Sequence, residues 1–120
     1  MTAINKDAFE QYRKVFGTEK MRLLWQEFYE STENKLQQIE KQSPEDIRLC
    51  FHTLRSSSLV FGLEEFSKNC EMIEEAVLNN ENFAKIKKYI DKTRRIFYNG
   101  CESINNLFER PVDEKNIGKP

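Results

Sequence analysis

Hydrophobic residues recur every three or four positions along most of the chain, a spacing that predicts amphipathic helices. One such stripe lies in residues 19–41 and contains Met21, Leu24, Trp25, Phe28, Thr32, Leu36 and Ile39. A short polar helix is expected before it, over residues 5–14. Gly17 interrupts the pattern between the two, and we expect Thr18 to be the N-cap of the second helix.

The second half of the chain predicts three more helices. Ser43, Pro44 and the acids after them are typical of a helix start, so a helix is expected over 44–61, with Gly62 as its stop. Similar stripes predict helices over 64–79 and 83–109. Since long amphipathic helices joined by short turns pack antiparallel, the expected fold is all-α. It is an up-down antiparallel four-helix bundle with an additional short N-terminal helix, over residues 1–110, and 111–120 form a flexible tail.

The charges argue against two classes of partner. The chain has 19 basic and 20 acidic residues and a net charge of −1, which gives no support for binding nucleic acid or anionic membranes. Residues 64–81 are acidic and residues 85–95 are basic, and on adjacent antiparallel helices they can face each other. A nucleic-acid patch is the competing interpretation of the basic run, but Tyr89 is its only interleaved aromatic residue. No segment has the ~18 apolar residues of a membrane span.

The three cysteines, Cys50, Cys70 and Cys101, contain no CxxC pair, and an odd number cannot all pair within one chain. A zinc site would need more ligands at closer spacing. We therefore expect reduced thiols in the core of a cytoplasmic protein. Because the predicted bundle is self-contained, we expect a monomer. We also expect no metal or cofactor on this chain and no ATP site, because the sequence has no GxxxxGK[ST] loop.

His52 is the only histidine of the chain. At about 100° per residue it lies about 140° from Ile47, which marks the core face of its helix, so the imidazole is expected to be exposed. Arg55 follows at i+3 and Ser56 at i+4. A neutral imidazole is a nucleophile, a guanidinium binds phosphoryl oxygens, and a small residue lets another protein approach. An ordinary surface histidine beside an ordinary arginine would give the same pattern.

The segment HTLRSSSLVFG, residues 52–62, resembles the signature of histidine-containing phosphotransfer (HPt) domains. That signature is roughly H-x-L-K-G-S-S, with a glycine ten residues after the histidine. The segment CEMIE, residues 70–74, resembles the C-x-x-I/L-E stripe of the family's next helix. Phe16-Gly17 and residues 23–28 resemble its preceding helix, so the similarity extends over about residues 10–108.

The resemblance implies a phosphoryl carrier that is not an enzyme in its own right. His52 would accept a phosphoryl group, on Nε2, from a phospho-aspartyl receiver domain and pass it to a second receiver. The partners would be receiver domains of a hybrid sensor kinase or a response regulator, and the receiver would supply Mg²⁺. Arg55 stands where the family usually has lysine and would stabilise the phosphoryl group, whereas Ser56 replaces the usual glycine. The expected partner-binding residues are Ser56, Leu59, Leu63 and Leu49.

Two alternatives remain open from the sequence. The Ser56 departure also fits a helical adaptor that binds receivers or other signalling proteins without transferring phosphate. An enzyme with a catalytic triad could use only His52, whose helix neighbours offer no orienting carboxylate, although another helix could provide one. A di-metal site in the bundle would need two Glu-x-x-His motifs, and the chain has one histidine.

Overall fold

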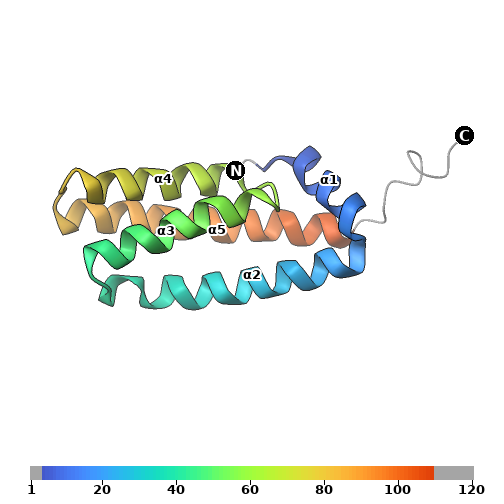
Figure 1. The fold of residues 1–120 in the computed structure, drawn as a ribbon, viewed down its shortest axis with the longest axis horizontal. Helices are drawn as coiled ribbons and strands as arrows, with labels where there is room; N and C mark the ends of the chain where they lie inside the picture. Colours follow the sequence, from blue (N-terminus) through green and yellow to red (C-terminus); the bar gives the residue numbers. More distant parts are fainter. Residues whose placement is uncertain (1–3, 110–120) are drawn as a thin grey trace, which may run out of the picture.

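The computed structural model describes residues 4–109, and the regular elements of this part are all helical (Figure 1). They are α1 (Lys6–Phe16), α2 (Thr18–Gln38), the short 3-10 helix η1 (Ile39–Lys41), α3 (Pro44–Leu59), α4 (Glu64–Leu78) and α5 (Phe83–Glu109). The all-α prediction is confirmed. The tail expected over 111–120 lies outside the described residues.

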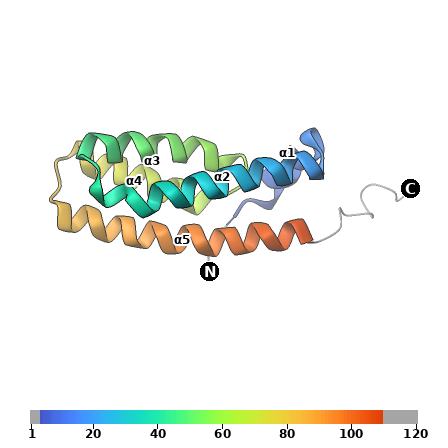
Figure 2. The same cartoon turned by 90° about the horizontal axis from the view of Figure 1, so that it is seen from below.

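Helices α2 to α5 run side by side as an antiparallel bundle, and α1 folds back across the end where α2 begins and α5 ends (Figures 1 and 2). The bundle is elongated along the direction of its helices (Figures 1 and 2). None of the helices among residues 4–109 is long and apolar enough to cross a membrane.

The start of α3 follows the predicted capping pattern, and its end differs slightly. The Ser43 hydroxyl accepts a hydrogen bond from the Asp46 amide at 3.2 Å, and Pro44 occupies the first turn. The helix ends at Leu59 rather than at Phe61. Gly62, with φ of 78°, still acts as the stop, because its amide donates to the Leu59 carbonyl at 3.1 Å.

The predicted N-cap of the second helix is wrong. Thr18 is already the first residue of α2, and the cap is Gly17, which makes no side-chain capping bond. Gly17 is also the C-cap of α1, and its amide donates to the Arg13 carbonyl at 2.8 Å. One glycine, with φ of 85°, thus ends one helix and begins the next. The non-helical cap position is therefore taken by Gly17, and Thr18 already has helical geometry.

The turn between α3 and α4 is tied to the start of α1. The Asn5 amide donates to the Gly62 carbonyl at 2.7 Å, and Asn5 Nδ2 donates to Glu64 Oε2 at 2.8 Å. The approach is so close that a Cβ on Gly62 would collide with the Asn5 carbonyl oxygen. The N-terminal segment therefore braces the turn that sets how α3 and α4 pair.

Aromatic side chains fill the centre of the bundle. The ring of Phe97 on α5 is fully buried and contacts the rings of Phe28, Tyr29 and Phe66 from α2 and α4. The cysteines are free thiols: Cys70 and Cys101 are buried, as expected, whereas Cys50 is only partly buried. Burial raises the pKa of Cys101 to about 12, so this thiol stays protonated at neutral pH.

In the basic run, Lys85 pairs with Glu81 of the acidic run, with Nζ 2.7 Å from Oε1, but two other cations pair with η1. Arg94 Nη1 lies 2.7 Å from Glu40 Oε2 on η1, and Lys87 Nζ lies 3.5 Å from the other oxygen of the same carboxylate. Hydrogen bonds from Arg94 hold the pKa of Glu40 below its ordinary value. The reason is packing: α5 also lies beside α2, whose last turn brings η1 to these cations, and Arg94 donates to the Leu36 carbonyl at 2.6 Å.

Candidate functional site

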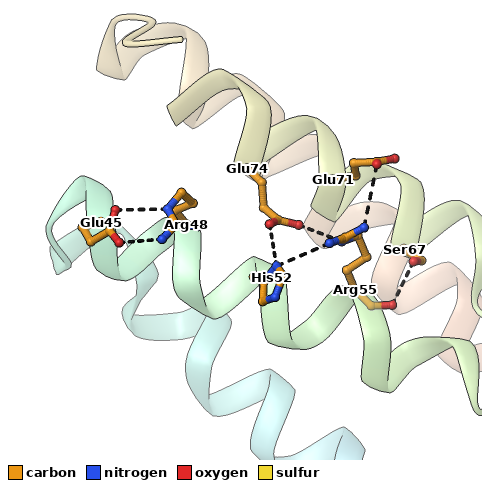
Figure 3. Close-up of polar contacts among 7 residues, drawn as sticks. All are labelled: Glu45, Arg48, His52, Arg55, Ser67, Glu71 and Glu74. Carbon is orange, nitrogen blue, oxygen red and sulfur yellow. Dashed lines mark hydrogen bonds and ion pairs between the residues drawn. The ribbon is translucent and has the colours of Figure 1, made fainter. Parts of the chain in front are cut away.

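His52 lies on α3 and its ring faces Glu74 on the neighbouring α4 (Figure 3). Its side chain is 53% exposed, and Nδ1 lies 2.8 Å from Oε1 of Glu74, whose side chain is only 9% exposed. The two helices form an antiparallel hairpin, so residues about equally far from the turn that contains Gly62 come side by side. This register pairs His52 with Glu74. Arg55, three residues closer to the α3–α4 connection, lies near Glu71.

The contact with Glu74 decides which ring nitrogen of His52 keeps a free lone pair. A carboxylate accepts hydrogen bonds and donates none, so we infer that Nδ1 carries the ring proton and donates it to Glu74. The unprotonated nitrogen is then Nε2, whose lone pair is free on a half-exposed ring. The buried carboxylate thus fixes both the tautomer and the orientation of the imidazole.

Arg55 lies between the histidine and two carboxylates. Its Nε is 2.8 Å from Glu74 Oε2, its Nη1 is 3.8 Å from Glu71 Oε2, and its Nη2 is 3.4 Å from His52 Nδ1 (Figure 3). Because Nδ1 donates to Glu74, the last contact is a close approach of a cation to the ring. The guanidinium is about one-third exposed and is held against α4.

The backbone under the site is also fixed to α4. The carbonyl of Arg55 accepts hydrogen bonds from the hydroxyls of Ser58, at 3.1 Å, and of Ser67, at 2.9 Å. Both serines are buried. One bond lies within α3 and the other joins α3 to α4, so they restrain the helix turn that carries Arg55.

A second arginine lies one turn before His52. Arg48 pairs with Glu45 through Nη2–Oε2 at 2.6 Å and Nε–Oε1 at 3.1 Å. The pair lowers the pKa of Glu45 and raises that of Arg48, so both stay charged near neutral pH. No group of three His, Cys, Asp or Glu side chains within residues 4–109 is arranged to hold a metal ion.

The structure supports the expected exposure of most of the predicted site residues and corrects one. His52 and Ser56 are exposed, and Leu49 and Leu59 are 46% and 45% exposed. Leu63 is fully buried, so its assignment to a partner-binding surface is wrong. It follows the turn at Gly62, and its amide donates back to the Ser58 carbonyl at 3.2 Å, which directs the residue into the core.

The contact of Glu74 with His52 was not predicted from the sequence, although the segment CEMIE, residues 70–74, contains this residue. The helix neighbours of His52 on α3 offer no carboxylate to orient its ring, and α4 provides one. A signal was present: in an antiparallel hairpin that turns at about Gly62–Leu63, counting eleven residues backwards and forwards from Leu63 pairs His52 with Glu74. The helical periodicity of α3 alone contains no information on this pairing, because the pairing depends on the register between two helices.

The fold and the site together define a class: a helical bundle that presents one half-exposed imidazole at its surface, with Nδ1 bound to a buried carboxylate. The Hpt domain family matches residues 23–96, from α2 well into α5, and the chain belongs to this family. No curated protein and no solved structure matches the chain. Membership gives the chain a phosphotransfer-related role in two-component signalling, with receiver domains as the class of partner.

Proposed function

We propose that this chain is a histidine phosphotransfer protein of a multistep phosphorelay. His52 accepts a phosphoryl group on Nε2 from the phospho-aspartate of one receiver domain and passes it to the aspartate of another. The observation that carries the proposal is the 2.8 Å contact between His52 Nδ1 and Glu74 Oε1 on a half-exposed ring. It leaves Nε2 as the only ring nitrogen with a free lone pair.

The transfer is a balanced displacement at phosphorus. The Nε2 lone pair attacks the phosphorus of the acyl phosphate, the N–P bond forms, and the P–O bond to the aspartate breaks, releasing a carboxylate. Nδ1 keeps its proton, so the phosphorylated ring carries a positive charge that faces Glu74. The reverse displacement on a second receiver restores neutral His52.

The chain contributes position rather than a complete catalytic site. The receiver supplies the aspartate and Mg²⁺, so this chain needs no cofactor of its own and acts as a carrier, not as an ATP-using kinase. Arg55 is the residue we expect to stabilise the phosphoryl group. Its guanidinium would have to move partly away from α4 to reach a group on Nε2, since its present contacts are on the Nδ1 side.

The surface around His52 suits a protein partner. Leu49 lies one turn before the histidine and Leu59 two turns after it, and both are almost half exposed. Ser56 is exposed between them and remains small although it replaces a glycine. We propose that this strip of α3 contacts receiver domains of a hybrid sensor kinase or a response regulator, with the chain acting as a cytoplasmic monomer.

A transfer assay tests the proposal. Receivers of the source organism are phosphorylated with acetyl phosphate, freed of donor and mixed with the chain and Mg²⁺. We expect an acid-labile, alkali-stable phosphoryl group on the chain, assigned to Nε2 by phosphorus NMR, and none on His52→Gln. Transfer from no receiver would contradict the proposal, and receiver binding without transfer would favour the adaptor. Phosphorylation that persists in His52→Gln would place the acceptor elsewhere.

A further inference from the structure

The positive charge beside His52 is already balanced before any phosphoryl group arrives. Arg55 is the cation that reaches the ring, and it faces two carboxylates on α4, Glu74 at 2.8 Å and Glu71 at 3.8 Å. The other arginine nearby, Arg48, is paired with Glu45. A dianionic phosphoryl group on Nε2 therefore meets no unpaired guanidinium among these side chains.

The two carboxylates that hold Arg55 are not equivalent. Glu74 is buried, binds the ring proton of His52 and lies close to Arg55, so it is fixed by two partners. Glu71 is 53% exposed, and its ion pair with Arg55 is long. If the guanidinium turns towards a phosphoryl group, the contact with Glu71 is the one that opens.

We propose that Glu71 competes with the phosphoryl group for Arg55 and thereby sets how firmly His52 holds it. This inference rests on the proposed function, because it assumes that His52 is the acceptor. Binding of Arg55 by the phosphoryl oxygens costs the ion pair with Glu71, so the phosphohistidine gains less than the full charge interaction. The site is thus adjusted to pass the phosphoryl group on rather than to store it. Glu71 acts through Arg55 and is a positioning residue.

The test is the equilibrium of the phosphoryl group between His52 and a receiver aspartate. At equilibrium this ratio does not depend on how fast the partners dock, so it separates the proposed effect from a change in the interface. In Glu71→Gln, Arg55 loses one competitor. We expect the ratio of phospho-His52 to phospho-receiver to rise about two- to fivefold, the range that exposed ion pairs produce.

Two matched variants show whether the effect runs through Arg55. Glu75→Gln removes the same charge from an exposed position one turn further along α4 and should leave the ratio unchanged. In an Arg55→Gln background, Glu71→Gln should have no further effect, because the cation for which the two groups compete is gone. High salt should reduce the effect of Glu71→Gln, since the pair is exposed.

The outcomes separate the two proposals. If wild-type protein accepts no phosphoryl group, the proposed function fails and this inference fails with it. If wild-type protein is phosphorylated but Glu71→Gln leaves the ratio unchanged, only the inference is overturned. It is also overturned if Glu75→Gln produces the same rise, or if the effect persists without Arg55. Circular dichroism and melting of each variant confirm that the compared proteins are folded.

Discussion

At the scale of single residues, Glu74 carries two interactions with one carboxylate. Oε1 accepts from His52 Nδ1 and Oε2 pairs with Arg55 Nε, and the side chain is almost completely buried. A buried carboxylate with two such partners cannot turn away from the ring without leaving a charge unpaired in the interior. The orientation of His52 is therefore set from α4.

Removing this carboxylate should impair transfer through the imidazole. In Glu74→Ala the ring is free to turn and to place its proton on Nε2. We expect transfer from a phosphorylated receiver to slow by about tenfold, less than the ~10⁴ caused by a wrong tautomer in a buried triad, because this ring is half exposed. The ¹⁵N shifts of the ring provide an independent measurement. Wild-type protein should show a protonated Nδ1, and the variant a mixture; identical shifts would contradict the assigned tautomer.

At this scale the sequence predicts properties that one helix determines, such as exposure, but not contacts between two helices. The exposure of His52 and Ser56 follows from the periodicity of α3 alone and agrees with the structure. The contact with Glu74 depends on the register of α3 against α4, which no single-helix argument contains. The prediction that Leu63 belongs to an exposed surface was wrong for a related reason. The direction of a side chain just after a helix is set by the turn and not by the periodicity of the helix.

At the scale of elements, Gly62 determines the geometry of the α3–α4 hairpin. It has a φ of 78°, and a Cβ there would meet the backbone of Asn5. We expect Gly62→Ala to lower the free energy of unfolding by about 1–3 kcal/mol from strained backbone alone, with a further loss from the collision. Urea unfolding measures this loss. Gly17 also has positive φ but has open space around its Cβ position, so Gly17→Ala should cost less. Equal losses would mean that the contact with Asn5 is unimportant.

The boundaries of the elements were predictable where local chemistry decides them. The Ser43-Pro44 start and the Gly62 stop follow from capping preferences that act within a few residues. The end of α2 does not follow from local capping preferences. Its last turn continues into η1, and Arg94 of α5 donates to the Leu36 carbonyl and pairs with Glu40 there. That cation is more than 50 residues away in the chain.

At the scale of the whole molecule, the antiparallel bundle was predicted from stripe lengths and short connections, because these leave few other ways to bury the apolar faces. The partners of the charged side chains were not predicted. Opposite charge on residues 64–81 and 85–95 allows α4 and α5 to pair electrostatically, and Lys85 does pair with Glu81. Each helix of a bundle has two neighbours, however, and Lys87 and Arg94 pair with Glu40 of η1. Composition alone cannot choose between neighbours.

Docking of a receiver domain involves the surface of the whole molecule, and a substitution at Ser56 tests it. The residue is exposed one turn after His52, so a large side chain there would obstruct a receiver without disturbing the core. We expect Ser56→Phe to reduce transfer from a phosphorylated receiver at least about tenfold, a loss of roughly 1.4 kcal/mol in transition-state binding. Helicity and melting should stay nearly unchanged. Phosphorylation of His52 by a small donor such as phosphoramidate should also persist, because a small molecule needs no flat contact surface.

Ser56→Gly is the matched control for that variant, since it restores the residue that the family usually has at this position. It should transfer at least as well as wild-type protein, at a cost of up to about 1 kcal/mol in stability from glycine within a helix. If Ser56→Phe lost both routes of phosphorylation while remaining folded, the obstruction would lie at the imidazole itself. If it lost neither, receivers would approach His52 from a side of α3 that avoids Ser56, and Leu49 rather than Leu59 would then be the apolar contact to vary next.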